Sequence, residues 1–354
     1  MRNKDHRLLK ERVLTIAELS ANHGRDIDIA KQTIKAAAKS GADAIKLQTY
    51  TPDTMTIQSE QDYFKLNHDT IWDGRTLYDL YEEAYTPWEW HQELFDYAHE
   101  QGLICFSSPF DSTAVDLLET LNTPAYKIAS FEITDIPLIG YAASKGKPMI
   151  LSTGIGTIQE IHDAIEACRR VGNDDITLLK CTSAYPAKIE DAKLNTMVNF
   201  KNTFNTEIGL SDHTYGSVVP IMAVSLGARV IEKHFILDKA IGGPDATFSM
   251  EPHEFHEMVN DVRQAEKALG QVDYSITEQK ATSRKLARSL FVVEDIGPGE
   301  IFTEDHVRSI RPGYGLSPKY LPEVLGKKAN KAIKKGTPLQ WNMIKDELNN
   351  LTPP

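Results

Sequence analysis

The sequence has few cysteines, no long apolar run and no excess of basic residues. Its three cysteines, Cys105, Cys168 and Cys181, are widely spaced among 354 residues and form no CxxC pair. This spacing argues against a disulfide scaffold and offers no recognisable zinc-binding set. We therefore expect ordinary buried thiols and a reducing, cytoplasmic environment.

The lack of long apolar runs and of net positive charge excludes further classes of protein. No apolar stretch approaches the roughly 20 residues that a membrane-spanning helix needs. The charged N-terminus, Met1–Glu11, has no apolar core of a signal peptide. The net charge is -11, with His counted as neutral, whereas a nucleic-acid-binding protein needs a basic face for the phosphates. A local basic cluster can still bind a small anion inside an acidic protein.

Short aliphatic and β-branched runs alternate with stretches of helical period through residues 1–270. The predicted strands are Val13–Ala17, Ala44–Leu47, Leu103–Phe106, Ala125–Ile128, Met149–Leu151, Ile176–Leu179, Glu207–Leu210 and Val230–Glu232. Predicted helices between them include Asp28–Ser40, Pro87–Gln101, Ser112–Leu121, Ile158–Val171 and Ser217–Leu226.

Local signals agree with these elements. Gly41 and Gly102 stand at helix ends, and Thr86-Pro87 predicts a capping Thr with Pro at the first helical position. Eight strand–helix units in about 250 residues are typical of a (β/α)8 TIM barrel. A doubly wound sheet is the alternative, but no Gly-rich dinucleotide-binding turn follows the first strand.

Three further segments depart from this pattern. Tyr50–Ala84 is long for a strand-to-helix connection, so we expect it to contribute to an active site. Gln271–Arg288 is polar and predicts a linker. Residues 289–354 carry short apolar runs broken by turns, which predicts a small, loop-rich second domain.

In a TIM barrel the active site lies at the carboxyl ends of the strands, and all eight predicted strands end in polar or charged residues. Buried charges need partners, so a shared pocket explains eight such ends better than eight separate ion pairs. The candidates at these ends include Glu18, Lys46, Gln48, Ser107, Ser108, Lys127, Ser130, Glu132, Ser152, Cys181, Ser211, His213, Glu232 and His234.

Two histidines end neighbouring strands. His213 and His234 could meet over the barrel mouth, and a pair of neutral imidazoles with open remaining positions suits a catalytic divalent cation. Two hydrogen-bonded core histidines are the alternative. His23 is a weaker third candidate, because it lies in a loop past its strand.

Lysines and hydroxyls gather at the same ends. Lys46 and Lys127, with Ser107, Ser108, Ser130, Ser152 and Ser211, predict a positive, donor-rich cup that fits a phosphate and a carboxylate. Lys127 could instead be a Schiff-base nucleophile. The sequence leaves both open.

Several motifs together resemble the sialic acid synthase family. They are Ala17–His23, Ala125–Ser130, Leu151–Gly154, Gly209–His213 and Ile231–His234, and the tail with Arg311-Pro312-Gly313 resembles that family's antifreeze-like (SAF) domain. Within the family, Lys46–Thr54, Thr86–His91 and Cys105–Asp111 resemble the pseudaminic acid synthase branch. Phe131, Ser183, Ala184 and Ser108 depart from the N-acetylneuraminate branch.

The resemblance implies a metal-dependent condensation of phosphoenolpyruvate with 2,4-diacetamido-2,4,6-trideoxy-L-altrose, with phosphate released by C–O cleavage. It implies that His213 and His234 hold a divalent cation (Mn²⁺, Mg²⁺ or Co²⁺) and that Glu18 orients or deprotonates water. The residues implied for phosphoenolpyruvate are Lys46, Ser108, Lys127, Ser130, Ser152 and Ser211, and those for the sugar are Glu132, Tyr185, Asp245 and Arg311. It also implies a domain-swapped homodimer in which Arg311 reaches the partner's pocket.

Alternatives remain. An N-acetylneuraminate or legionaminate synthase of the same family would share the chemistry but take another sugar. A Schiff-base aldolase would use Lys127, and a non-catalytic sugar-binding protein would leave eight polar strand ends without a purpose.

Overall fold

The chain forms two compact units, residues 1–270 and 271–354. The structure, a computed structural model, describes residues 12–66 and 72–345. The N-terminal stretch Met1–Glu11, for which the sequence predicts no signal peptide, lies outside the described residues. Among the described helices, none is both long and apolar enough to cross a bilayer.

The first unit is the predicted TIM barrel. In its described part, eight parallel strands close into a barrel in chain order. They are β1 Leu14–Glu18, β2 Ala44–Thr49, β3 Ile104–Pro109, β4 Tyr126–Ile128, β5 Met149–Ser152, β6 Ile176–Cys181, β7 Glu207–Asp212 and β8 Val230–His234. Every predicted run overlaps its strand. Most strands end later than predicted, because polar residues at the barrel mouth continue the ladder.

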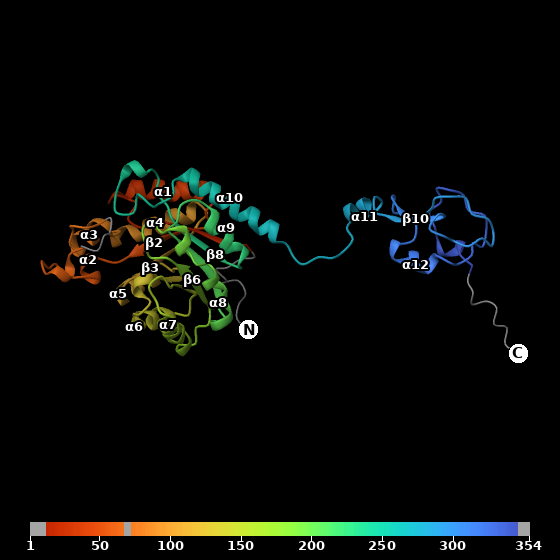
Figure 1. The fold of residues 1–354 in the computed structure, drawn as a ribbon. Helices are drawn as coiled ribbons and strands as arrows, with labels where there is room; N and C mark the ends of the chain where they lie inside the picture. Colours follow the sequence, from red (N-terminus) through yellow and green to blue (C-terminus); the bar gives the residue numbers. More distant parts are fainter. Residues whose placement is uncertain (1–11, 67–71, 346–354) are drawn as a thin grey trace. The chain divides into compact units, whose positions relative to one another are not determined.

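Helices surround the strands (Figure 1). They are α1 Ile27–Lys39, α4 His91–Glu100, α5 Ser112–Thr120, α6 Ile136–Ser144, α7 Ile158–Arg170, α8 Asn195–Phe204, α9 Val218–Ser225 and α10 Pro252–Leu269. Local caps fix several starts: the Asp26 side chain accepts from two amides of α1, and Thr157 and Glu160 form a capping box on α7.

One predicted helix start is wrong. Trp88–Trp90 forms a 3₁₀ turn (η3), and α4 begins only at His91. Thr86 caps neither, because its buried hydroxyl lies 3.2 Å from Nε2 of His23 instead.

The core has two layers. One lies between the strands and the helices, and includes Ile45, Leu47 and Phe95. The other fills the barrel interior and contains Leu14, Ile16, Ala44, Phe106, Ala125, Ile150, Leu179 and Val230. The barrel interior is thus filled by a plug of these eight apolar side chains and forms no pore. Any site must therefore lie beyond this plug, at the carboxyl ends of the strands.

The connection after β2 is as long as predicted and holds short elements of its own. Its described part contains α2 Pro52–Met55, a 3₁₀ turn at Asp62–Phe64 (η2) and α3 Leu77–Ala84. We call residues 50–84 the β2–α4 connection.

The second unit is small and rich in loops, as predicted. Strands β9 Ser289–Val292 and β10 Val307–Ile310 pair antiparallel over a core that includes Leu290, Val292 and Phe302. The segment predicted as a linker contains a helix, α11 Glu278–Arg284, and a second short helix, α12, spans Leu321–Val324.

The loops of the first unit also contain 3₁₀ turns at Ser130–Glu132 (η4), Ile189–Asp191 (η5) and Lys239–Ile241 (η6).

Gly209 in β7 gives a test of barrel packing. A Cβ atom there would lie 2.6 Å from Leu179 Cδ2 and 2.7 Å from the Val230 carbonyl oxygen. We expect Gly209→Ala to lower the free energy of unfolding by about 1–3 kcal/mol through overpacking, measured by urea unfolding. Gly140→Ala in α6 is the control, since a Cβ there meets no atom within 4 Å and Ala favours a helix interior. Equal stability of wild type and Gly209→Ala would contradict the packing described.

Candidate active site

The side chains at the barrel mouth follow the two-residue alternation of the strands. Leu14 and Ile16 fill the barrel interior, so the next inward position on β1 is Glu18, because successive side chains point to opposite faces. On β8, Val230 in the plug is likewise followed inward by Glu232 and His234. Both strands thus carry polar groups directly above an apolar layer.

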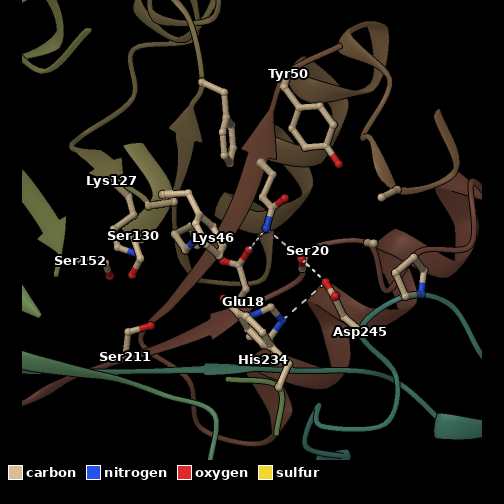
Figure 2. A pocket seen from close by; sticks show the side chains of 18 of the residues that line it. Glu18, Ser20, Lys46, Tyr50, Lys127, Ser130, Ser152, Ser211, His234 and Asp245 are labelled. Carbon is tan, nitrogen blue, oxygen red and sulfur yellow. Dashed lines mark hydrogen bonds and ion pairs between the residues drawn. The ribbon is translucent and has the colours of Figure 1, made fainter. Parts of the chain in front are cut away.

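These inward positions line a single pocket that opens over about 1030 Å³, its mouth included. Figure 2 shows Ser130, Ser152 and Ser211 on one side of Lys46, and Tyr50 and Asp245 on the other. The predicted site residues in the lining are Glu18, Lys46, Lys127, Ser130, Glu132, Ser152, Tyr185, Ser211, His213, His234 and Asp245.

A chain of alternating charges forms the pocket floor. Lys46 Nζ lies 2.5 Å from Glu18 Oε2 and 3.6 Å from Glu232 Oε1, and Lys127 Nζ lies 3.1 Å from the same Glu232 oxygen. Gln48 Nε2 donates to Glu18 Oε1 at 2.9 Å. The cup predicted from the lysines is therefore not purely positive: each lysine already faces a carboxylate.

Burial separates the carboxyl groups by their pKa values. Burial raises the pKa of Glu18 to about 6, although Lys46 opposes it, and raises the pKa of Glu132 to about 7. Burial would also raise the pKa of Glu232, but Lys127 and Lys46 outweigh it and lower that pKa. The carboxyl groups of Glu18 and Glu132 can therefore each take up or release a proton near neutral pH, while Glu232 stays ionised.

The two predicted histidines do meet, with ring centroids 5.2 Å apart. Nδ1 of His213 lies 3.0 Å from the Thr182 carbonyl oxygen; a proton donated there leaves the Nε2 lone pair free. Nδ1 of His234 lies 3.8 Å from Asp245 Oδ2 without a hydrogen bond. Burial lowers the pKa of His234 well below its ordinary value, so this imidazole is neutral.

This donor pair fits a divalent cation that takes its other ligands from outside the chain. Within residues 12–66 and 72–345, no three His, Cys, Asp or Glu side chains gather around one metal position. His23 is not a third member. Its Nδ1 accepts from the Arg25 amide at 3.0 Å, its ring packs against Trp90, and it does not line the pocket.

Buried polar atoms without hydrogen bonds concentrate in this pocket. Among the described residues, the lining contributes Glu18 Oε2 (ion-paired with Lys46), Glu132 Oε2, Ser152 Oγ, Glu232 Oε2 and His234 Nδ1. Buried polar atoms normally have partners. Their gathering in one pocket indicates that a polar ligand completes it.

Three predicted residues lie elsewhere. Ser107 points out of the barrel, where its Oγ lies 2.6 Å from Thr49 Oγ1, so its place in the cup was wrong. Ser108 does not line the pocket; it lies behind Lys46 and accepts from its Nζ at 3.2 Å. Arg311 is exposed in the second unit and stays a prediction.

Other pocket residues received no role from the sequence. Glu232 and Gln48 were noticed only as strand ends, although their inward parity would have placed them beside Glu18 and Lys46. Ser20 Oγ donates to Asp245 Oδ2 at 2.5 Å. Met55, Trp72 and Tyr81 come from the β2–α4 connection, where no periodicity predicts which side chains turn inward.

Comparison with known proteins follows the same division of the chain. The model of the NeuB family matches residues 33–274, and that of the SAF domain matches residues 287–345. The predicted antifreeze-like domain is thereby confirmed.

Relatives match over nearly the whole length. The chain is 52% identical to pseudaminic acid synthase of Helicobacter pylori, over 94% of this chain and 98% of the relative. It is 36% identical to N,N'-diacetyllegionaminic acid synthase of Legionella pneumophila, over 93% and 94%. The crystal structure of N-acetylneuraminic acid synthetase from Leptospira borgpetersenii, in complex with citrate, shares 29% identity at a TM-score of 0.69, covering 77% of this chain and 90% of that one. The chain, with its polar barrel mouth and its SAF domain, therefore belongs to the NeuB family of enzymes.

Proposed function

We propose that the protein is a pseudaminic acid synthase, which condenses phosphoenolpyruvate with 2,4-diacetamido-2,4,6-trideoxy-L-altrose. The observation that carries this proposal is the meeting of Lys46, Lys127 and a row of serines with the two imidazoles of His213 and His234 at one barrel mouth. The 52% identity to the Helicobacter pylori enzyme supports the choice of sugar.

The reaction forms one C–C bond and breaks one C–O bond, without oxidation or reduction. Carbon 3 of phosphoenolpyruvate attacks the aldehyde carbon, and the aldehyde oxygen gains a proton. The oxygen of a water molecule bonds to carbon 2, and the water releases a proton. The bond between carbon 2 and the phosphate oxygen then breaks, and the new hydroxyl on carbon 2 passes its proton to the leaving phosphate, which leaves a ketone and inorganic phosphate.

Lys127, Ser130, Ser152 and Ser211 would bind phosphoenolpyruvate on one side of the floor, together with Lys46. Ser152 Oγ has no partner among the described residues, so it is free to donate. Ser130 Oγ accepts from the Gly154 amide at 3.1 Å, which holds this hydroxyl in place in the pocket lining. Ser108 would act only through Lys46.

His213 and His234 would hold the divalent cation. When bound, such an ion supplies a Lewis acid for the aldehyde oxygen and positive charge for an anionic substrate. Additional positive charge would be useful here, because Glu18 and Glu232 already neutralise much of the charge of Lys46 and Lys127 at the pocket floor. The hydrogen bond of His213 to the Thr182 carbonyl would hold its ring in place.

Glu18 would orient or deprotonate the attacking water. It is buried at the floor, and its Oε1 is fixed by the Gln48 amide while Oε2 faces Lys46. A pKa raised to about 6 leaves the carboxyl mostly ionised at neutral pH and still able to take up a proton.

Glu132, Tyr185 and Asp245 would bind the sugar, since all three line the pocket. Arg311 would add a contact from the second unit of a partner subunit, in a domain-swapped homodimer. The three cysteines are free and buried, which agrees with a reducing compartment such as the cytoplasm.

A panel of sugars tests the proposed substrate. We expect metal-dependent phosphate release from phosphoenolpyruvate with the altrose-configured diacetamido sugar. Its mannose-configured counterpart and N-acetylmannosamine should react at least about 10-fold more slowly, since small groups give discrimination of this size. Release with one of the other sugars alone would keep the family and make the protein a legionaminate or N-acetylneuraminate synthase. No release with any sugar would point to the non-catalytic reading.

Metal removal tests the imidazole pair. We expect a chelator to lower phosphate release at least about 100-fold and Mn²⁺ to restore it, because the cation activates the aldehyde. His234→Gln should stay inactive at the same Mn²⁺ concentration. His162→Gln, at an exposed histidine of α7, is the matched control and should behave as wild type.

The same assay decides the role of Lys127. Burial lowers the pKa of Lys127, a shift that would also suit a Schiff-base nucleophile. Activity that survives chelation, with borohydride linking the substrate to Lys127, would establish the aldolase alternative and overturn the metal role.

Replacing Glu18 tests the water-activating carboxylate. Glu18→Gln can keep the contact with Gln48 but loses the basic oxygen, so we expect kcat to fall about 100-fold or more with little change in the KM for phosphoenolpyruvate. Glu207→Gln makes the same change at the exposed start of β7 and should leave kcat unaltered. A Glu18→Gln variant with wild-type kcat would remove Glu18 from the chemistry.

A further inference from the structure

The pocket has two sides of different chemistry. The floor carries the charges, serines and imidazoles described above. The opposite side is mainly apolar, and most of it comes from the β2–α4 connection. We call its members the apolar wall: Tyr50, Met55, Trp72, Leu80, Tyr81 and Ala84.

Hydrogen bonds hold the helices of this wall in place. Thr51 and Thr54 form a capping box on α2, which ends at Met55. Tyr78 on α3 donates to Asp53 Oδ1 at 3.3 Å, and this bond joins the two short helices. Met55 from α2 and Leu80, Tyr81 and Ala84 from α3 thus belong to one built surface.

Aromatic contacts fix the inner edge of the wall. The Tyr50 ring packs edge-on against Tyr81 at 5.7 Å and against Phe110 at 5.2 Å, and Trp88 Nε1 donates to the Tyr50 carbonyl at 3.1 Å. In Figure 2 Tyr50 lies across Lys46 from Ser152 and Ser211. At Tyr50, the wall therefore lies on the opposite side of the pocket from the serines that we propose to bind phosphoenolpyruvate.

The wall also reaches the proposed sugar contacts. Trp72 Nε1 donates to the Pro244 carbonyl at 3.0 Å, next to Asp245, and its ring lies 5.7 Å from that of Tyr185. The apolar surface and the polar sugar contacts thus form one continuous rim.

We propose that the apolar wall selects the deoxygenated, methyl-bearing end of the sugar, with Met55 as a specificity-determining residue. This inference rests on the proposed function. The reacting aldehyde must lie at the imidazoles, so the remote carbons of the open chain extend away from the floor. On the diacetamido trideoxy sugar that end carries an acetamido methyl at carbon 4 and the methyl of carbon 6. N-acetylmannosamine has hydroxyls at both places, which would lose water against Met55 and Leu80 without gaining a partner.

The test changes the polarity of the wall at nearly constant volume. Met55 is half-buried at the end of α2, so Met55→Gln introduces an amide where the thioether lay, and Met55→Leu is the apolar control. Steady-state kinetics with the diacetamido altrose sugar should show kcat/KM about 10-fold lower for Met55→Gln. Met55→Leu should stay within about twofold, and the KM for phosphoenolpyruvate should not change in either variant.

A structural defect would give a different result, since it would weaken both substrates together. Equal kcat/KM for Met55→Gln and Met55→Leu, or a matching rise in the KM for phosphoenolpyruvate, would contradict the proposed role of the apolar wall. If the wild type still turns over the diacetamido sugar, the proposed synthase function stands. A wild type that converts no sugar would overturn both. Ala84→Ser, at a half-buried position of the same wall, is the second variant and should lower the same kcat/KM by a smaller factor.

Discussion

The two-residue period of the barrel strands is the constraint on which the site depends. Because every second side chain points inward, a strand that contributes Ile16 to the plug must contribute Glu18 to the layer above it. Strands β2, β4 and β8 direct Lys46, Lys127 and Glu232 into the same layer as Glu18, so these four charges form one chain of ion pairs across the barrel mouth. A buried charge is tolerated only beside its partner. The chemistry of the mouth is therefore built on the packing beneath it.

The outward positions of the same strands carry a different set of polar groups. Lys233 lies 2.8 Å from Asp212, and its Nζ also donates to the Thr214 carbonyl. Thr49 lies between Ser107 and Nε2 of His91. These partners are satisfied and lie behind the barrel wall, whereas several inward atoms have no partner among the described residues. The outward polar groups thus hold strands and helices together, whereas the inward ones are available to bind a ligand.

Much of the fold and about the inner half of the site could be predicted from the sequence. The eight strands were found because apolar runs buried on both faces stand out between helical segments. Their carboxyl ends were placed too early, since Lys180 or Ser211 looks like a loop residue until the ladder is seen. Ser107 was assigned to the pocket because strand parity was not applied to it. His23 was considered as a metal ligand because nothing in its sequence neighbourhood shows that Thr86 and Arg25 already use its ring nitrogens. The orientations of Met55, Trp72 and Tyr81 could not be predicted, because tertiary contacts decide which side chains turn inward in a connection built of short elements.

The β2–α4 connection gives the barrel a modular character. One continuous stretch of chain supplies most of the apolar lining, while the ion pairs and imidazoles come from the strands themselves. Insertions or exchanges within that stretch would reshape the pocket without moving a strand. On the proposed role of the apolar wall, the choice of sugar and the charged floor therefore depend on separate parts of the chain.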